Sequence, residues 1–264
     1  MVIPKGLYGM VNLPLRVRAS TDGRRGSAGQ TPTPSAASAG SGAGHGSASS
    51  TSAGGVHPAA GHPQGLPSLV LELAQALMAG GSRILQLRMK TAPGGAVLRA
   101  LEELRPLVRR RPGVKLIVND RLDVALAGGA DGVHLGQSDL PLRVARALCP
   151  PGFLIGVSTH DEEQVEAALE GGADYIAFGP IYPTASKDNP DPVLGVARLR
   201  AVCAASPVPV VAIGGITLEN AAAVGAVADC AAVIGALCPP GDTTVHGVAA
   251  RATALHRAIV GAGR

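Results

Sequence analysis

Short apolar runs rich in β-branched residues recur along the chain and alternate with longer stretches of helical character. Eight such runs predict β-strands, at Leu7–Val11, Ile84–Leu87, Lys115–Val118, Gly132–Leu135, Phe153–Val157, Tyr175–Phe178, Val208–Ile213 and Ala231–Ile234. Between most of them lie stretches rich in Ala, Leu, Glu and Arg with helical period, such as Ser68–Ala79, Gly95–Val108 and Asp161–Glu170. Continuous apolar strands alternating with helices predict a parallel sheet that helices cover on its outer side.

The number of strand–helix units decides between architectures. Eight units predict a closed (β/α)₈ TIM barrel rather than an open, doubly wound sheet. No Gly-x-Gly-x-x-Gly motif follows the first predicted strand, which argues against a dinucleotide-binding fold. We expect one domain over residues 1–264, with its chemistry at the carboxyl ends of the strands.

One segment interrupts this pattern between the first strand and its helix. From Ala19 to Gly65 the chain is almost wholly Gly, Ser, Ala, Thr and Pro. Such a segment cannot bury enough apolar surface to offset its ordering entropy, so we expect a disordered insert. Lengthening a loop from ~5 to ~50 residues costs only about 2 kcal/mol of closure free energy, which a barrel can tolerate.

The composition fits this fold and narrows the function. Hydrophobic residues make up 46% of the chain and aromatic residues only 2%, so Ala, Val, Leu and Ile must form the core. The net charge of +4 is modest and the Lys and Arg residues are scattered, which suits a small anionic substrate and argues against nucleic acid. No apolar run approaches the ~20 residues of a membrane span. Met1–Met10 also lacks the apolar stretch of a signal peptide, so we expect a cytoplasmic protein, with a homo-oligomer left open.

The cysteines predict neither a disulfide nor a zinc site. None of Cys149, Cys203, Cys230 and Cys238 forms a Cys-x-x-Cys pair. We expect small buried thiols in a reducing compartment.

The second predicted strand carries polar residues at alternate positions. Gln86, Arg88 and Lys90 share one side of the strand, and the residues between them are apolar. If the apolar side faces the helices, two cations and an amide point into the mouth of the barrel, where we favour a pyrophosphate site. The alternative for Lys90 is an ion pair at the rim with Glu102 or Glu103.

Carboxylates follow the third and fourth predicted strands. Asp120 and Asp139 would lie at the same end of adjacent strands, beside the basic trio. Each alone is better explained as a cap of the following helix. Together they suit Mg²⁺, which takes one or two carboxylates plus phosphate oxygens. Between them, His134 is expected to form a hydrogen bond near the mouth and to have no metal role.

The last four strands also end in polar or glycine-rich segments. Ser158 or Thr159 could cap the next helix, in a capping box with Glu162, or contact a ligand; the two roles are compatible. The Pro-rich loop after Phe178, with hydroxyls and a Lys, is typical of an active-site lid, the alternative being a plain surface loop. Glycines after the seventh and eighth strands predict a phosphate site formed by backbone N–H groups, although Gly-Gly alone could be a tight turn.

Five segments together resemble the thiamine phosphate synthase (thiamine phosphate pyrophosphorylase) family. They read QLRMK from Gln86, VNDRLDVALAGGADGVHLGQSDLP from Val118, GVSTH from Gly156, FGPIYPTASK from Phe178 and VAIGGI from Val211. The most specific part is VND followed by ADGVHLGQ-x-D. The resemblance implies a Mg²⁺-dependent transferase of thiamine biosynthesis that joins hydroxymethylpyrimidine pyrophosphate to a thiazole phosphate. Pyrophosphate leaves, and a carboxylated thiazole would lose CO₂ as well.

The resemblance also implies roles for individual residues. Asp120 and Asp139 bind Mg²⁺. The pyrimidine pyrophosphate is contacted by Gln86, Arg88, Lys90, Asn119, Ser158 and Lys187. The thiazole phosphate is surrounded by Thr184, Ser186, Gly215, Ile234 and Gly235. The catalytic candidates are Arg88, Lys90, Ser158 and Lys187.

Three positions depart from the family pattern. Met89 stands where an acidic residue is common, Ser186 replaces a usual Thr and keeps its hydroxyl, and Gly235 replaces a usual Ser and lacks a hydroxyl.

Two other functions compete with the synthase. A tautomerase paralogue of the same fold would act on the thiazole phosphate alone and would not need the two aspartates or the full basic trio. A non-catalytic phosphate-binding protein would not need every residue of both anion sites.

The insert has few residues that could anchor it across the mouth, so we predict that it takes no part in turnover. Replacing Ala19–Gly65 with a short Gly-Ser connector should leave kcat and both KM values within about threefold, under ~0.7 kcal/mol of transition-state binding. Steady-state kinetics of the folded deletion variant measure kcat and both KM values. A larger loss would show that the segment contributes to catalysis or substrate capture.

Overall fold

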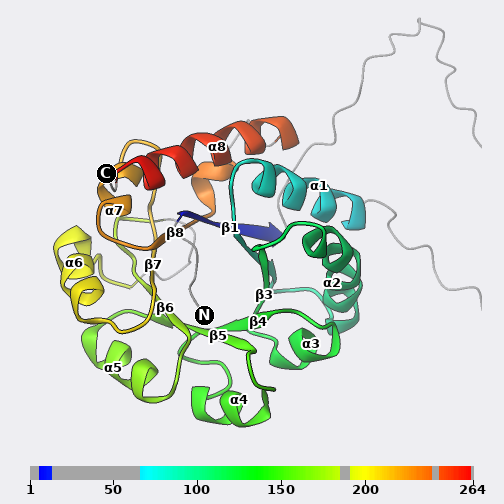
Figure 1. Ribbon diagram of the computed structural model, residues 1–264, viewed down its shortest axis with the longest axis horizontal. Coiled ribbons are helices and arrows are strands. Elements are labelled where there is room, and N and C mark those ends of the chain that lie inside the picture. Colours follow the sequence, from blue (N-terminus) through cyan, green and yellow to red (C-terminus); the bar gives the residue numbers. More distant parts are fainter. Residues whose placement is uncertain (1–5, 14–65, 185–190, 240–243, 263–264) are drawn as a thin grey trace, which may run out of the picture. The chain divides into compact units, whose positions relative to one another are not determined.

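Eight parallel strands close into a barrel with helices on its outside in the computed structural model (Figure 1). The structure describes residues 6–13, 66–184, 191–239 and 244–262. Each strand pairs with the next along the chain, and β8 pairs with β1 to close the ring. The predicted TIM barrel is therefore confirmed. The predicted disordered insert, Ala19–Gly65, and two predicted site residues, Ser186 and Lys187, lie outside the described residues.

Strands and helices alternate along the described chain. The strands are β1 (Gly6–Leu13), β2 (Ile84–Met89), β3 (Lys115–Asn119), β4 (Gly132–Leu135), β5 (Leu154–Thr159), β6 (Tyr175–Phe178), β7 (Val210–Ile213) and β8 (Cys230–Val233). The helices are α1 (Leu66–Ala79), α2 (Gly94–Arg109), α3 (Leu122–Ala127), α4 (Leu142–Leu148), α5 (Glu162–Glu170), α6 (Gly195–Ala205), α7 (Ala221–Gly225), α8 (Val245–Gly261) and the short 3₁₀ helix η1 (Gly235–Leu237).

Several strands extend further toward their carboxyl ends than the apolar pattern predicted. β1, β2, β3 and β5 each continue by one or two residues, because polar residues there still join the ladder. Asn119 pairs with His134 across β3 and β4, and Ser158 pairs with Ala177 across β5 and β6. The polar ends that interrupt the hydrophobic pattern are thus part of the barrel wall.

The predicted start of β7 at Val208 is wrong by two residues. Pro209 has no N–H to donate to a neighbouring strand, and the Val208 N–H donates to the Ser206 hydroxyl instead (3.3 Å). Ladder pairing therefore begins at Val210.

The predicted caps of α5 are also wrong. Asp161 is the N-cap, and its carboxylate accepts a hydrogen bond from the Gln164 N–H (2.7 Å). Thr159 is fully buried, and its hydroxyl donates to the Ala177 carbonyl (3.3 Å). Ser158 and Thr159 are both strand residues, so neither starts the helix.

Side chains alternate between two apolar clusters, one inside the barrel and one between strands and helices. The inner cluster comprises Tyr8, Met10, Ile84, Ile117, Leu154, Tyr175, Ala177, Val211, Cys230 and Ala232. The residues between these positions belong to the much larger outer cluster. This period of two fixes which side chain of every strand faces the barrel axis.

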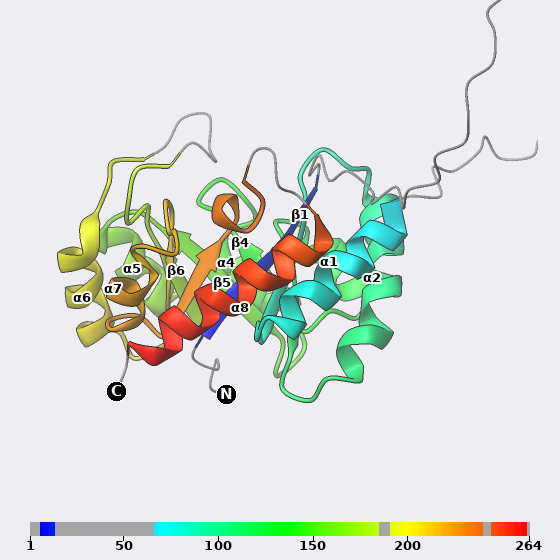
Figure 2. The ribbon, with the colours of Figure 1, turned by 90° about the horizontal axis from the view of Figure 1, so that it is seen from above.

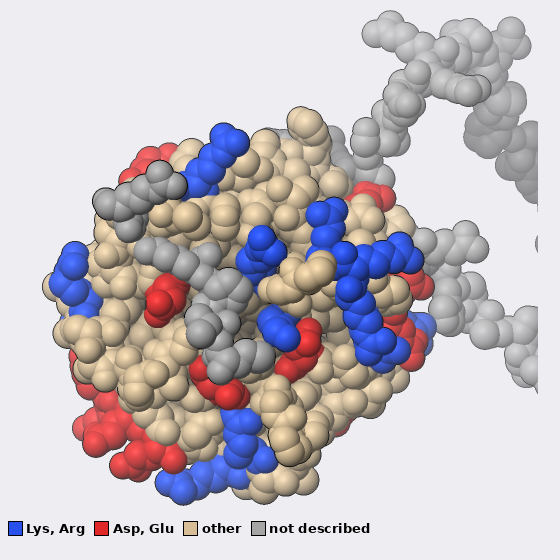
Figure 3. Space-filling model, in the orientation of Figure 1, with Lys and Arg blue, Asp and Glu red and all other residues tan. Residues whose placement is uncertain are grey.

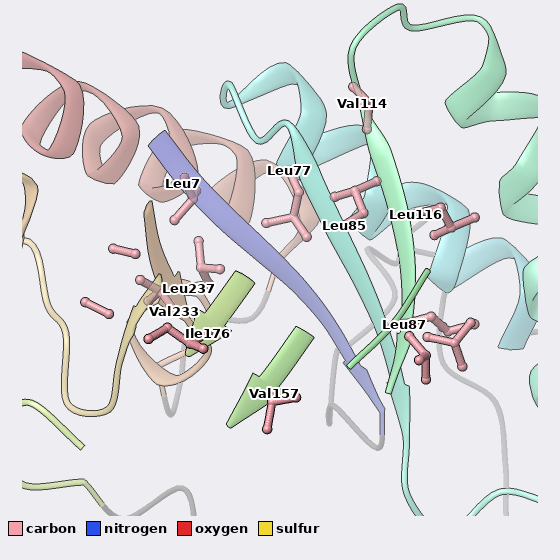
Figure 4. Packing of buried hydrophobic residues seen from close by; sticks show 14 of the residues in the cluster. Leu7, Leu77, Leu85, Leu87, Val114, Leu116, Val157, Ile176, Val233 and Leu237 are labelled. Atoms are coloured by element: carbon pink, nitrogen blue, oxygen red, sulfur yellow. The ribbon is translucent and has the colours of Figure 1, made fainter. Parts of the chain in front are cut away.

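The outer cluster fixes the helices to the barrel. Leu77 of α1 lies beside Leu85 on the outer side of the strands (Figure 4), and both side chains are almost fully buried. Seen from the side, α1 and α8 form an outer layer over β1 (Figure 2). At Gly9 of β1, a Cβ would lie 3.2 Å from a methyl carbon of Leu77, so glycine lets α1 pack tightly against this strand.

Three aspartates stabilise the end of the barrel at which the strands begin. Asp131, Asp174 and Asp229 each directly precede an even-numbered strand. Each accepts a hydrogen bond from a backbone N–H at or near the start of the preceding strand, at 2.8, 2.7 and 3.0 Å. A carboxylate that accepts backbone N–H groups holds two neighbouring strands in register, so this end of the barrel is built for stability.

The cysteines, the surface charges and the helix lengths complete the description of the fold. All four cysteines are free thiols, but only Cys230 is fully buried and the other three are half-buried. On the face shown in Figure 3, several basic side chains lie next to one another at the right and several acidic side chains lie at the lower left. Within the described ranges, no helix combines the length and the apolar character that crossing a membrane requires.

Candidate active site

The polar trio of β2 lies as its alternation predicted. Gln86 is inside the barrel and only 1% exposed, Arg88 is half-buried, and Lys90 is exposed just past the end of the strand. The alternative of a rim ion pair for Lys90 is wrong. In the described part of the chain no ion pair joins it to Glu102 or Glu103, which line a groove between α1 and α2.

The side-chain amide of Gln86 has unmet hydrogen-bonding capacity. Both its Nε2 and its Oε1 are buried without a hydrogen-bond partner among the described residues. A buried polar group without partners costs stability, and such groups in native proteins mark places where a ligand or water supplies the bonds. Gln86 is therefore suited to a ligand entering from the mouth.

Asp120 and Asp139 come close together beside this trio. Burial and the proximity of Asp139 raise the pKa of Asp120 to about 6, and the charges of Lys90 and Arg88 partly oppose this rise. The backbone of Asp120 has a φ of +63°, in the left-handed region that residues with a Cβ rarely adopt. Strain of this kind costs roughly 1–3 kcal/mol and gathers at functional sites.

Neither aspartate caps a helix, so that alternative is wrong for both. The N-cap of α3 is Arg121, whose side chain makes no capping hydrogen bond, and the N-cap of α4 is Pro141. Asp139 instead accepts a hydrogen bond from the Gly136 N–H (2.6 Å), which closes the turn after β4. The Asp120 N–H donates to the His134 carbonyl (2.8 Å), which joins the ends of β3 and β4.

A small cavity opens beside the ends of β2 and β3. Its volume is about 80 Å³, and its lining includes Met89, Lys90, Asn119 and Asp120. Lys90 and Asn119 therefore share one hollow with Asp120, whereas Gln86 and Arg88 are not among its lining residues. Met89, which departs from the family pattern, forms part of its wall.

A chain of hydrogen bonds crosses the barrel interior behind Ser158. The Ser158 hydroxyl lies 2.9 Å from His134 Nε2, His134 Nδ1 lies 3.1 Å from the Tyr175 hydroxyl, and that hydroxyl lies 3.0 Å from the hydroxyl of Tyr8. The hydrogen bond predicted for His134 is confirmed. Burial lowers the pKa of His134 to about 4 and raises the pKa values of both tyrosines, so all three rings are uncharged at neutral pH.

Tyr8 and Tyr175 were not recognised from the sequence as parts of the site. Both look like ordinary strand residues, and their contact joins positions 167 residues apart. The sequence offered one indication: both tyrosines occupy strand positions whose side chains face the barrel axis. A phenol facing the interior of a barrel needs a hydrogen-bond partner.

The glycines after β7 have a packing role that the sequence did not reveal. A Cβ on Gly214 would lie 2.6 Å from Pro180 Cα, and one on Gly215 would lie 2.4 Å from the Pro183 carbonyl oxygen. Both have positive φ, of +95° and +64°. The loop after β6 is thereby held against the end of β7, and half-buried Thr184 lies in this loop.

Two more predicted residues lie at the end of β8, next to β7 in the barrel. Ile234 is half-buried, and Gly235 is exposed and begins η1. The described residues predicted to surround the thiazole phosphate thus follow three consecutive strands, β6, β7 and β8: Thr184, Gly215, Ile234 and Gly235. Ser186 and Lys187 lie outside the described residues.

Comparison with known proteins gives one family. The family model described as thiamine monophosphate synthase matches residues 62–237. The thiamine-phosphate synthase of Anaeromyxobacter dehalogenans is 50% identical over 170 residues, which are 64% of this chain and 76% of that protein. That of Methanoculleus marisnigri is 48% identical over 174 residues, 66% of this chain and 82% of that protein.

Solved structures agree with this family. The thiamine phosphate pyrophosphorylase of Pyrococcus furiosus is 34% identical with a TM-score of 0.64, covering 73% of this chain and 90% of its own. A KDPGal structure, at 18% identity and a TM-score of 0.56, shows the shared barrel fold alone. The chain therefore belongs to the thiamine monophosphate synthase family and is a transferase of thiamine biosynthesis.

Proposed function

We propose that this enzyme joins hydroxymethylpyrimidine pyrophosphate to a thiazole phosphate at the mouth of the barrel, with Mg²⁺ bound by Asp120 and Asp139. The bond from the pyrimidine methylene carbon to the pyrophosphate oxygen breaks, and the electron pair leaves with pyrophosphate. The thiazole nitrogen then forms the new bond to the methylene cation. A carboxylated thiazole also loses CO₂. The observation that supports this proposal best is the pair of adjacent carboxylates beside Arg88 and Lys90.

The chemistry of the aspartate pair fits a divalent cation. Asp139 raises the pKa of Asp120, as expected for two carboxylates held close together without enough compensating charge. In the described ranges, no group of three or more His, Cys, Asp or Glu side chains is placed to hold a metal ion. Two carboxylates suffice for Mg²⁺ when phosphate oxygens and water complete its coordination. When bound, Mg²⁺ stabilises negative charge on a phosphoryl oxygen.

The protein's own cations act on the same charge. Arg88 is half-buried, so its attraction for pyrophosphate oxygens is screened less than that of a surface arginine. Lys90 and Asn119 lie on the neighbouring strand ends, and the free amide of Gln86 lies deeper on the axis side. These groups stabilise the leaving pyrophosphate, so the reaction needs no side-chain nucleophile.

The thiazole phosphate is assigned to the other half of the mouth. Thr184, Ser186, Gly215, Ile234 and Gly235 would surround it, and Lys187 would reach the pyrimidine or its pyrophosphate from the same loop. Because Gly235 lacks the hydroxyl common in the family, this phosphate depends more on backbone N–H groups. Exposure of Gly235 leaves its N–H accessible to an anion.

A pyrophosphate-release assay with each substrate alone and with both separates the candidate functions. We expect release only when both substrates and Mg²⁺ are present. Release of no pyrophosphate, with isomerisation of the thiazole phosphate alone, would favour the tautomerase. Binding of phosphates without any turnover would favour the non-catalytic protein.

Asp120→Ala and Asp139→Ala should each lower kcat on the order of 10³-fold or more, because neutralising the leaving group is worth several kcal/mol. Both residues lie at a solvent-facing mouth, so the melting temperature should change little. Asp123→Ala is a matched control, since Asp123 is exposed and, among the described residues, forms an ion pair with Arg121 alone. Near-wild-type turnover in either variant at saturating Mg²⁺ would contradict the metal assignment.

Arg88→Ala should weaken binding of the pyrimidine pyrophosphate roughly 10- to 100-fold, the value of a hydrogen bond to a charged group, and leave the thiazole phosphate largely unaffected. Calorimetry with each substrate measures this difference. Arg83→Ala is the control, because Arg83 is exposed just before β2 begins, at the opposite end of the barrel. Equal losses for both substrates would contradict two separate anion sites.

A further inference from the structure

The hydrogen bonds behind Ser158 form one continuous chain with a single exit at the mouth. Its members are Ser158, His134, Tyr175 and Tyr8, joined by three hydrogen bonds. His134, Tyr175 and Tyr8 are 6%, 0% and 1% exposed, and Ser158 is half-buried. Only Ser158 can therefore meet a ligand directly.

The local packing holds this chain in place. The rings of His134 and Tyr175 stack at a centroid distance of 5.6 Å, and Tyr8 meets Tyr175 at 6.1 Å. A Cβ on Gly156 would lie 1.9 Å from Cζ of Tyr175, so a glycine at this inward position of β5 is required for the phenol to cross the interior. The rings cannot turn away to find other partners.

The protons in this chain can run in two directions. His134 is buried and each of its ring nitrogens meets a hydroxyl group, an arrangement that suits a neutral ring in which one nitrogen donates and the other accepts. If Ser158 donates to His134, then His134 donates to Tyr175, Tyr175 donates to Tyr8, and the proton of Tyr8 is left over. In the opposite direction Tyr8 donates to Tyr175, Tyr175 to His134 Nδ1 and His134 Nε2–H to Ser158, and the proton of Ser158 is left over.

Burial decides between these directions. Among the described residues, Tyr175 is the oxygen partner of the Tyr8 hydroxyl, and the thiol of Cys230, which belongs to the same inner cluster, is only a weak acceptor. In the first direction a fully buried O–H would lack an oxygen acceptor and would incur a desolvation penalty. In the second, every buried proton has an acceptor, and the free proton lies at the mouth, where a ligand or water can accept it.

We propose that Tyr8, Tyr175 and His134 orient the Ser158 hydroxyl so that it donates a hydrogen bond into the active-site mouth, to an acceptor atom of the substrate. His134 and Tyr175 are then positioning residues, and the acceptor is a pyrimidine ring nitrogen or a pyrophosphate oxygen. The identity of this substrate rests on the proposed function. The direction of the hydrogen bonds does not.

The direction is measured in the wild-type protein by long-range ¹H–¹⁵N NMR with ¹⁵N-labelled histidine near neutral pH. We expect His134 to be the uncharged tautomer protonated at Nε2, with its signals assigned by their loss in His134→Gln. A ring protonated at Nδ1, or a doubly protonated ring, would overturn the proposal whatever reaction the enzyme performs.

Calorimetry then identifies the acceptor. Ser158→Ala should weaken binding of the pyrimidine pyrophosphate about fivefold if a ring nitrogen is the acceptor, and roughly 10-fold or more if a charged pyrophosphate oxygen is the acceptor. An equal loss of affinity for inorganic pyrophosphate with Mg²⁺ would place the acceptor on the pyrophosphate. A loss of affinity confined to the pyrimidine pyrophosphate would place the acceptor on the pyrimidine ring. No loss for either ligand would overturn the proposal.

Two substitutions of His134 test its positioning role. Gln can both accept from Tyr175 and donate to Ser158, whereas Leu can do neither. We expect His134→Gln to keep the KM for the pyrimidine pyrophosphate closer to wild type than His134→Leu does, with the KM for the thiazole phosphate unchanged in both. Equal effects of the two variants on both KM values would indicate a merely structural histidine and contradict the role.

Discussion

The alternation of inward and outward side chains around a closed parallel barrel is the constraint on which the whole site depends. The register of β1 against β8 closes the ring and fixes the phase of every strand. A slip of one residue in β2 would turn Gln86 and Arg88 toward α1 and α2 and bring Leu85 and Leu87 to the axis. The inner apolar cluster opposes such a slip, because Ile84 shares the inward phase of Gln86.

The two ends of the barrel divide stability from chemistry. At the end where the strands begin, Asp131, Asp174 and Asp229 accept backbone hydrogen bonds that join neighbouring strands. At the other end, Asp120 and Asp139 lie close together, Asp139 accepts a backbone hydrogen bond only within its own turn, and Asp120 has a strained backbone. Aspartates thus stabilise the fold at the end where the strands begin, whereas the two aspartates at the opposite end form a site suited to a cation.

Much of this organisation could be predicted from the sequence, because it depends on local periodicity. Alternation in β2 predicted the inward trio, and Asp120 and Asp139 were placed by the strands that they follow. What the sequence could not show depends on contacts between distant segments. The bond between Tyr8 and Tyr175 exists only because the ring closes, and the need for glycine at Gly214 arises from the backbone of the loop after β6.

The central claim is that residues from neighbouring strands form one Mg²⁺–pyrophosphate site. Crystals grown with inorganic pyrophosphate and Mn²⁺, which replaces Mg²⁺ and scatters anomalously, test it most directly. The account predicts an anomalous peak within coordination distance, roughly 2.0–2.3 Å, of both Asp120 and Asp139 or of waters they bind, with pyrophosphate contacting Arg88. Pyrophosphate bound at the mouth with no metal near either carboxylate, or metal bound elsewhere in the barrel, would contradict it.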